Sequence, residues 1–165
     1  MRPLLAVCLL CVGTAPVATA AAHPRTISTS GVRLVVPVGW HVAISTTPGC
    51  DPERLVVASS APVRFLPGGR LRAPGSDDLL LLLLEDRYIQ DRPVGDLRRP
   101  THFSVTWNRL ARLKAVCGLP NAPAYMRYFK THGRYLGFIV YPGARVGETT
   151  RAKTLAVMNS LRISA

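Results

Sequence analysis

A run of six consecutive leucines, Leu79–Leu84, constrains the fold of this chain more than any other feature of its sequence. Asp77 and Asp78 precede the run, and Glu85 and Asp86 follow it. The run is far shorter than the roughly 20 apolar residues that a helix needs to cross a bilayer. Because it has neither a helical nor an alternating period, both of its faces must be covered by other parts of the protein. We therefore expect a buried central strand, with about one turn of buried helix as the alternative.

The N-terminus has the plan of a secretory signal peptide. Arg2 supplies the positive region, Leu4–Val12 the apolar region, and Ala18-Thr19-Ala20 the small-x-small cleavage pattern. We therefore expect a signal peptide over residues 1–20, cleaved near residues 20–22, and a secreted, extracytoplasmic protein. One alternative is a short buried N-terminal helix. A lipoprotein modified at Cys8 is disfavoured, because the few residues before this cysteine leave no room for a normal apolar region.

Removal of the signal leaves about 145 residues, enough for one domain with its own core. We expect residues 21–30 to be a mobile polar lead-in and residues 31–165 to form a single domain. Two cysteines remain, Cys50 and Cys117, and in an exported chain such a pair indicates a disulfide. The bond would close a long loop and stabilise the fold by about 4 kcal/mol on the chain-entropy model. Two separate thiols are the alternative.

Short strands outnumber helices along the chain. The expected strands are Val32–Val36, Trp40–Ile44, Leu55–Ser59, the leucine run, a segment that begins at Phe103, and a hairpin of Ala124–Phe129 and Tyr135–Tyr141 across Lys130–Arg134. Leu110, Leu113 and Val116 are spaced like one face of a helix.

The strongest helix pattern is Glu148–Leu161. Its apolar face contains Ala152, Leu155, Met158 and Leu161, and its solvent side contains Arg151, Lys153 and Asn159. The order of elements predicts an α+β fold, with a mostly antiparallel sheet packed against one or two helices.

Four short motifs occur in a recurring order: Leu34–Trp40 with its Pro-x-Gly-Trp sequence, Cys50-Asp51-Pro52, Gly133-Arg134, and Val157–Ile163. In this order the chain resembles uncharacterised secreted proteins of actinobacterial type and, more distantly, the Mog1/PsbP-like α/β/α sandwich. The resemblance spans roughly Gly31–Ile163. It implies a sandwich fold and a binding or accessory role, and it carries over no catalytic residue.

Combinations of residues that would indicate catalysis are scarce. The carboxylates on the two sides of the leucine run would lie about 26 Å apart on a strand. Glycosidases place their carboxylates about 5–9.5 Å apart, so we interpret these residues as markers of the strand ends. None of the four histidines lies at metal-ligand spacing from another histidine or a cysteine, so no metal or other cofactor is expected.

The segment Arg134–Tyr141 approaches the strand pattern of RNA-binding RRM domains. Its arginine, its glycine, Phe138 and Tyr141 fit, whereas Tyr135 and Leu136 occupy the positions of the required glycine and of the first stacking aromatic. Export would also separate the protein from RNA. We therefore favour an ordinary strand and do not expect nucleic acid as a partner.

The chain carries a net charge of +12, and most of its basic residues are arginines. Such an excess favours anionic envelope polymers or lipid surfaces as partners of an exported protein. The candidate residues for this contact are Arg64, Arg70 and Arg72 before the leucine run and Arg92, Arg98 and Arg99 after it. Because loops that flank one strand start at opposite ends of it, we expect diffuse charge and not one concentrated site.

The favoured hypothesis is a secreted, monomeric, non-enzymatic domain that binds or scaffolds at the cell envelope. The alternative is a small exported enzyme whose catalytic residues are dispersed in the sequence, with Asp51, His102 and His132 as the first candidates. Convergence of these three side chains in one pocket would support the enzyme.

Overall fold

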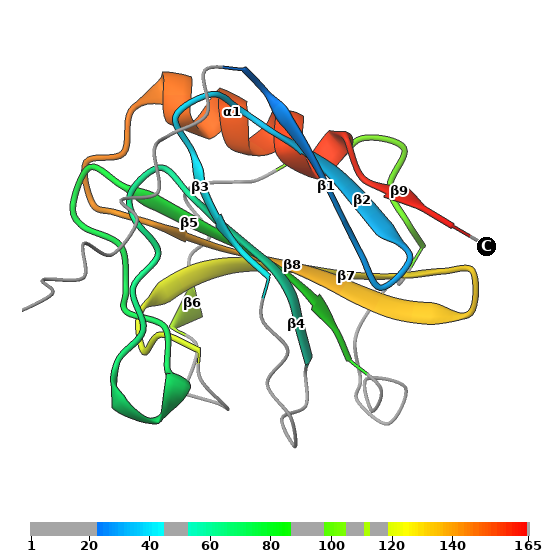
Figure 1. Cartoon of the computed structure of the whole chain (residues 1–165), viewed down its shortest axis with the longest axis horizontal. Helices are drawn as coiled ribbons and strands as arrows, with labels where there is room; N and C mark the ends of the chain where they lie inside the picture. Colours follow the sequence, from blue (N-terminus) through cyan, green and yellow to red (C-terminus); the bar gives the residue numbers. More distant parts are fainter. Residues whose placement is uncertain (1–22, 45–52, 87–97, 105–110, 113–118, 165) are drawn as a thin grey trace, which may run out of the picture.

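In the residues that the structure describes, the fold consists of two antiparallel sheets and one α-helix (Figure 1). The computed structural model describes residues 23–44, 53–86, 98–104, 111–112 and 119–164. The larger sheet has the strand order β3-β4-β5-β8-β7-β6, and the smaller sheet has the order β1-β2-β9. All neighbouring strands in both sheets run antiparallel, which confirms the α+β class and the mostly antiparallel sheet.

The strands are β1 (Arg25–Thr29), β2 (Val32–Val36), β3 (His41–Ala43), β4 (Glu53–Ser59), β5 (Leu79–Glu85), β6 (Ala111–Arg112), β7 (Pro123–Thr131), β8 (Arg134–Pro142) and β9 (Arg162–Ile163). The 3-10 turn η1 (Pro67–Gly69) lies between β4 and β5, and the helix α1 (Glu148–Asn159) lies between β8 and β9.

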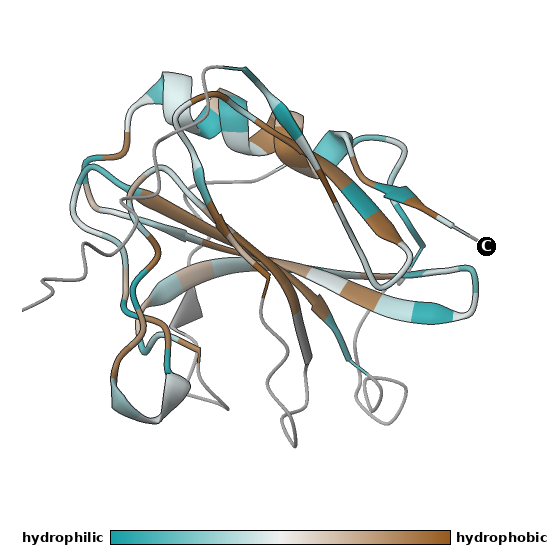
Figure 2. Ribbon diagram, viewed as in Figure 1, coloured by the Kyte–Doolittle hydropathy of each residue, from teal (hydrophilic) through white to brown (hydrophobic). Residues whose placement is uncertain are grey.

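The leucine run forms β5, the strand at the middle of the larger sheet. It pairs with β4 on one side and β8 on the other, and each of its six leucines is at most 3% exposed. Figure 2 shows the resulting apolar band through the centre of the sheet. A fully buried leucine side chain contributes about 1.5–3 kcal/mol, so this strand is a major source of stability. The prediction of a central strand buried on both faces is confirmed.

Alternate leucines of β5 face two different cores. Leu79, Leu81 and Leu83 pack in one core with residues of α1 and β2, while Leu80, Leu82 and Leu84 pack in the other. Helix α1 and the smaller sheet cover the first face of the larger sheet (Figure 1). Connecting segments cover the second face, where Val63, Leu71 and Leu119 pack.

Three phenylalanines stabilise the first core. The rings of Phe103 and Phe129 and those of Phe103 and Phe138 are 5.1 Å apart between centroids, in edge-to-face geometry. Such pairs contribute about 0.5–1.5 kcal/mol beyond the area that they bury. Asn159 holds this segment in place, since its Oδ1 accepts a hydrogen bond of 2.7 Å from the backbone N–H of Phe103.

Several local predictions were wrong. Residues 25–29 were expected in a mobile lead-in but form β1, because their backbone pairs with all five residues of β2. The buried face of α1 contains Thr154, Val157 and Met158, whereas Ala152 is exposed. Asn159 was expected in solvent but bonds to the backbone of Phe103.

The expected helical face of Leu110, Leu113 and Val116 lies outside the described residues, but the two described residues between Leu110 and Leu113 form a strand. Ala111–Arg112 is β6 and pairs with the start of β7. Phe103 is buried but lies outside the strands. The hairpin of β7 and β8 and the strand β4 are where the sequence predicted them.

Some expectations concern residues outside the described ranges. These are the signal peptide over residues 1–20, the cysteines Cys50 and Cys117, the residue Asp51, and Arg92. They remain predictions. Among the residues that the structure describes, no helix has the length and apolar character needed to cross a membrane.

Candidate functional site

The connection between β4 and β5 carries three of the candidate arginines on one small loop. We call the segment from Arg64 to Arg72 the arginine loop. It projects from the end of the sheet on the side away from α1 and contains η1 (Figure 1). Arg64, Arg70 and Arg72 are all exposed to solvent.

Backbone hydrogen bonds fold the arginine loop into a miniature hairpin. Phe65 and Leu71 form an isolated antiparallel bridge, and the N–H of Arg72 donates to the carbonyl of Arg64 at 2.9 Å. At the tip, the N–H of Leu66 donates to the carbonyl of Arg70 at 2.7 Å. Gly68 and Gly69 both have positive φ there, which glycine adopts without strain. The loop therefore has a defined backbone.

A single apolar side chain anchors the arginine loop to the domain. Leu71 is 1% exposed and belongs to the second core, below the larger sheet. Phe65, which is bridged to Leu71, is 45% exposed. The loop thus buries one apolar residue and presents another to solvent.

Arg64 and Arg72 stand opposite each other on the two arms of this hairpin. Like charges at directly opposed positions destabilise a pair of strands. Both arginines line a cleft of about 310 Å³, which also borders Ser59, Asp78 and Leu80. An anionic group placed between the two guanidinium groups would remove this repulsion.

Two serines connect the end of β4 to the start of β5 beside the cleft. The hydroxyl of Ser59 donates to the carbonyl of Leu79 at 3.0 Å, and Ser60 accepts a hydrogen bond from the N–H of Leu79 at 2.9 Å. The hydroxyl of Ser60 also donates to Oδ1 of Asp78 at 3.5 Å. These bonds hold the start of β5 against the end of β4, and so they place the arginine loop.

The three guanidinium groups of the arginine loop differ from most others in the protein. Within the described ranges, we find no hydrogen bond or ion pair to the side chains of Arg64, Arg70 or Arg72. By contrast, each of the following arginines bonds to a carboxylate or to a backbone carbonyl: Arg25, Arg99, Arg134, Arg145, Arg151 and Arg162. Within the described ranges, the guanidinium groups of the arginine loop therefore do not stabilise the fold through hydrogen bonds or ion pairs.

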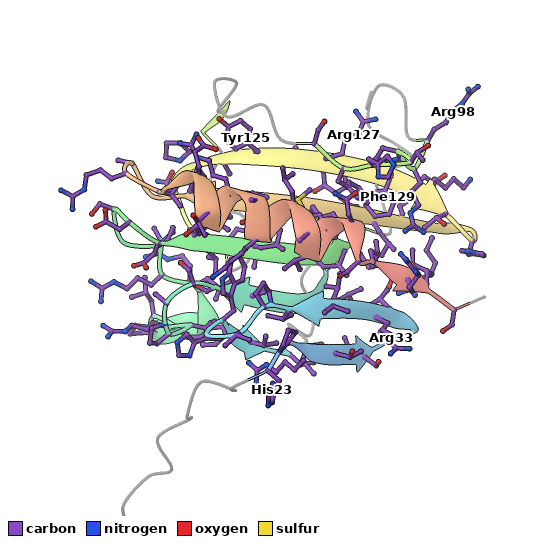
Figure 3. All side chains as sticks on the ribbon, turned by 90° about the horizontal axis from the view of Figure 1, so that it is seen from above. His23, Arg33, Arg98, Tyr125, Arg127 and Phe129 are labelled. Carbon is purple, nitrogen blue, oxygen red and sulfur yellow. The ribbon has the colours of Figure 1, made fainter. Side chains whose placement is uncertain are left out.

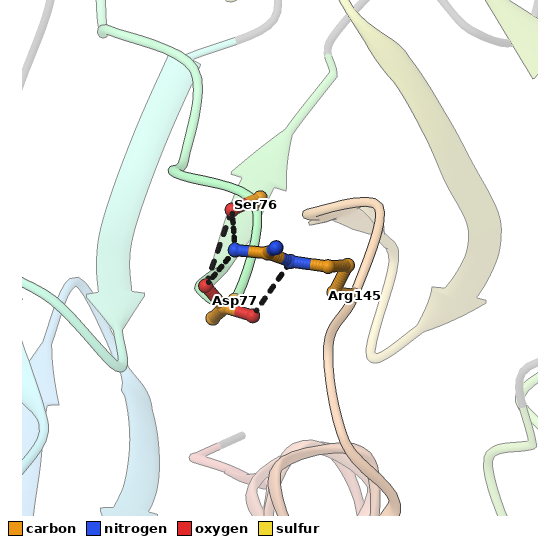
Figure 4. Close-up of polar contacts among 3 residues, drawn as sticks. All are labelled: Ser76, Asp77 and Arg145. Carbon is orange, nitrogen blue, oxygen red and sulfur yellow. Dashed lines mark hydrogen bonds and ion pairs between the residues drawn. The ribbon is translucent and has the colours of Figure 1, made fainter.

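Two of the carboxylates that flank the leucine run form ion pairs with arginines at or beyond the ends of β8. Glu85 pairs with Arg134 at 2.7 Å, at one end of β8, and Asp77 pairs with Arg145 at 2.9 Å, beyond the other end. Figure 4 shows the second pair, in which Arg145 also donates to the hydroxyl of Ser76 at 3.1 Å. Hydrogen bonding to Arg145 lowers the pKa of Asp77, and its bond to Asp77 raises the pKa of Arg145.

The structure does not bring the other candidate arginines to the arginine loop. The backbone of Arg98, whose side chain is labelled in Figure 3, forms a parallel bridge with Lys130 near the turn of the β7–β8 hairpin, and Arg99 donates to the carbonyl of Leu161 at 2.7 Å. That turn lies beside the end of β5 at Glu85, whereas the arginine loop lies beside Leu79. The rise of β5 separates the two ends by about 20 Å. The candidate arginines that the structure describes therefore form two separate groups, one on the arginine loop and one with Arg98 and Arg99.

The candidates for an enzyme do not form a pocket in the described part of the chain. His102 and His132 are both exposed, and neither lines the cleft beside the arginine loop. Among the described residues, no group of three or more histidine, cysteine, aspartate and glutamate side chains is placed to hold a metal ion.

The strand that resembles an RNA-binding motif keeps its aromatic residues inside the protein. Phe138 and Tyr141 are both 0% exposed, so neither ring is available to stack on a base. Gly137 has a structural role, because any Cβ at this position would overlap the ring of Tyr128 on the neighbouring strand. Burial raises the pKa of Tyr141, whose hydroxyl makes no hydrogen bond within the described residues.

Sequence reasoning named the three arginines but missed how the arginine loop holds them. The pattern Arg-Phe-Leu-Pro-Gly-Gly-Arg-Leu-Arg contains a Pro-Gly-Gly turn between the apolar pair Phe65-Leu66 and Leu71, which is a weak signal for a hairpin. Comparison of the chain with protein-family models, with curated proteins and with solved structures found no match.

Proposed function

We propose that this chain is a secreted, non-enzymatic domain that binds anionic material of the cell envelope through the arginine loop. The observation that supports this proposal is that three exposed arginines lie on one structured loop without a carboxylate partner in the described ranges. Guanidinium groups of this kind bind phosphates and carboxylates with paired hydrogen bonds.

The described carboxylates support the same assignment. Asp77, Glu85 and Glu148 each pair with an arginine elsewhere in the fold. These three are therefore not available to neutralise the arginine loop. Asp78 borders the same cleft, where it accepts a hydrogen bond from Ser60, so one carboxylate faces the three arginines and an excess of positive charge remains. Such a surface attracts anionic partners over roughly one screening length, about 8 Å at physiological salt.

The fixed backbone of the arginine loop favours binding. A partner that meets a preformed loop does not have to order it, so less of the binding free energy is lost to conformational entropy. The bonds that fix the loop are those between Arg64 and Arg72 and between Leu66 and Arg70, together with the buried anchor Leu71.

We also propose the finer fold assignment, a Mog1/PsbP-like sandwich, and keep the predicted export signal and the Cys50–Cys117 disulfide as parts of the account. The antiparallel sheet with α1 over one face supports the sandwich. In the described ranges, connecting segments and not helices cover the other face.

The test is sedimentation of the purified protein with isolated cell envelopes. We expect binding at low salt and its loss at about 1 M salt, where the screening length is about 3 Å. The variant Arg64→Gln/Arg70→Gln/Arg72→Gln is expected to lose this binding.

The matched control is Arg33→Gln/Arg127→Gln/Lys153→Gln. It removes the same charge from three other exposed positions, and it is expected to bind nearly as well as the wild type. Equal loss in both triple variants would mean that charge acts diffusely, and wild-type binding by the first variant would mean that the loop is not the site. Either result contradicts the proposal.

A further inference from the structure

The cleft beside the arginine loop is lined by charged groups of both signs. Arg64 and Arg72 line it from the arginine loop, and Asp78 lines it from the turn that precedes β5. Among the described residues, no group bonds to either guanidinium, and none donates a hydrogen bond to Oδ2 of Asp78. A molecule in the cleft therefore meets two sets of donors and one acceptor that the described fold leaves without partners.

The hairpin directs the two guanidinium groups to the same side. Side chains at directly opposed positions of an antiparallel pair point to one face, so Arg64 and Arg72 lie on the face opposite Phe65 and Leu71. The Cα atoms of such a hydrogen-bonded pair are about 5.5 Å apart. Both arginines can therefore reach one anion from two sides. Arg70 lies nearer the tip and does not line the cleft.

A phosphate fits between two guanidinium groups better than a carboxylate does. A phosphate monoester presents three strong acceptor oxygens and carries a charge of about −1.5 to −2 at pH 7. Two of its edges can each take the paired N–H groups of one arginine. A carboxylate has two oxygens in one plane, and a single arginine occupies both of them. The opposed pair of arginines therefore favours a phosphate.

Asp78 restricts which phosphates the cleft accepts. The N–H of Asp78 donates to the carbonyl of Gly75 at 3.2 Å, and the hydroxyl of Ser60 donates to its Oδ1 at 3.5 Å. A Cβ on Gly75 would lie 2.7 Å from Oδ2, so the glycine leaves room for the carboxylate. A carboxylate fixed beside a phosphate site repels the phosphate unless the rest of the ligand donates hydrogen bonds to it.

We infer that the cleft binds one polyol phosphate unit, with its phosphate between Arg64 and Arg72 and a hydroxyl that donates to Asp78. The inference rests on the proposed function, because it names the unit of anionic material that the arginine loop recognises. Two arginines and one carboxylate give the lining a net positive charge, which favours such a ligand over a zwitterion without net charge. The cleft, at about 310 Å³, lies at the small end of ligand sites, so it takes a single unit.

The experiment is an NMR titration of the whole protein at low salt with glycerol 3-phosphate and, separately, with methyl phosphate. Methyl phosphate has the same charged group but no hydroxyl. We expect the wild type to bind glycerol 3-phosphate about tenfold more tightly, from one hydrogen bond to a charged acceptor.

Asp78→Ala is expected to bind glycerol 3-phosphate about tenfold more weakly than the wild type does, and methyl phosphate at least as tightly. An unfolded variant would lose both ligands, so this opposite response identifies the role of Asp78. We expect the variant to fold, because the side chain is partly exposed and makes one long hydrogen bond, and circular dichroism checks this.

Two further comparisons separate geometry from charge. Arg64→Gln and Arg72→Gln are each expected to weaken binding of both ligands about tenfold. Arg70→Gln is the matched control, because it removes the same charge from the same loop outside the cleft, and we expect a change of less than about twofold. Gly75→Ala keeps every charge but displaces the carboxylate of Asp78, so we expect it to remove the preference for glycerol 3-phosphate.

The outcomes distinguish the inference from the proposed function. Equal affinities of the wild type for the two phosphates, or equal losses in Arg64→Gln and Arg70→Gln, would overturn the inference. Loss of envelope binding in the triple arginine variant would still support the proposed function in that case. Conversely, selective binding of glycerol 3-phosphate together with wild-type envelope binding by the triple variant would support the cleft and contradict the proposed function.

A competition experiment identifies the source of the unit. Lipid-extracted envelopes present it in polymers, and phosphatidylglycerol vesicles present it as a lipid headgroup. We expect an excess of glycerol 3-phosphate to displace the wild type from whichever of these it binds, while the same excess of methyl phosphate displaces less. Absence of displacement from both materials would overturn the inference.

Discussion

Arg134 binds Glu85 through two parallel hydrogen bonds, from Nε to Oε1 at 2.8 Å and from Nη2 to Oε2 at 2.7 Å. Glu85 ends β5 and Arg134 begins β8, so the pair locks the register of the two central strands. The third nitrogen, Nη1, donates to the carbonyl of Ser30 at 2.7 Å and joins the β1–β2 turn to the same point. One guanidinium group therefore connects the two sheets.

This arrangement predicts unequal costs for two arginine substitutions. The side chains of Arg134 and Glu85 are 22% and 20% exposed, so Arg134→Ala leaves a carboxylate in a partly buried place. We expect a loss of about 2–3 kcal/mol in the free energy of unfolding, measured with urea. Arg145→Ala removes the exposed ion pair with Asp77, and we expect it to leave the free energy of unfolding unchanged within error. Equal effects would contradict this assignment.

The pKa of Asp77 provides a second prediction. Hydrogen bonding to Arg145, and then to Ser76, lowers this pKa from its ordinary value of 3.8. A carboxyl group with a lowered pKa in the folded state stabilises the fold above its unfolded pKa, and this contribution is lost as the pH falls through the folded value. An NMR titration of the carboxyl carbon is expected to show a midpoint below 3.8 in the wild type.

In Arg145→Gln the same titration is expected to move up towards the ordinary value. An unchanged midpoint in this variant would show that the Asp77–Arg145 pair does not persist in solution.

Gly143 allows the turn before β5 to pack against the end of β8. A Cβ on Gly143 would overlap the carbonyl oxygens of Gly75 and Ser76, which are backbone atoms that cannot rotate away. We expect Gly143→Ala to cost about 2 kcal/mol or more in thermal or urea unfolding. Gly147→Ala meets open space and is expected to cost about 1 kcal/mol or less, from the weaker N-cap of α1.

Tyr141 allows a test of the second core. Its hydroxyl is buried without a hydrogen bond in the described part of the chain, and burial raises its pKa. Removing an unsatisfied buried group is neutral or favourable, so Tyr141→Phe is expected to keep or raise the free energy of unfolding by about 1 kcal/mol. Ser59→Ala removes a buried bond to the carbonyl of Leu79 and is expected to lower it by about 1 kcal/mol. A marked loss in Tyr141→Phe would reveal a partner for the hydroxyl.

The sequence predicted most of the central sheet because the strongest patterns in the chain are local. A strand of six consecutive leucines has apolar side chains on both faces, so each face must be covered by a core. The two faces of β5 pack in two separate cores. The β7–β8 hairpin follows from two apolar segments around a short turn with Gly133. β1 was missed because Arg25–Thr29 is mostly polar, and it is a strand only through its pairing with β2.

The buried face of α1 was misjudged for a similar reason. Thr154 is polar, but its hydroxyl bonds to the carbonyl of Thr150 at 2.8 Å, so it can be buried beside Val157. Ala152 is small enough for either environment, and the packing of neighbouring elements determines where it lies. Local pattern does not contain that information.

The candidate site could be predicted only in part. The basic residues of the arginine loop and their separation from Arg98 follow from the sequence, since loops flanking one strand start at opposite ends. The opposition of Arg64 and Arg72, and the exposure of Phe65 beside a buried Leu71, depend on a hairpin held by three backbone hydrogen bonds. Such a short hairpin has too weak a pattern to be recognised without the structure.

The most direct test of the account is to compare two variants of equal net charge in binding to isolated envelopes at low salt. We predict that Arg64→Gln/Arg70→Gln/Arg72→Gln weakens binding by on the order of 100-fold, from about fivefold for each arginine, while Arg33→Gln/Arg127→Gln/Lys153→Gln weakens it only slightly. Equal affinities of the two variants would contradict the claim that the arginine loop is the binding site.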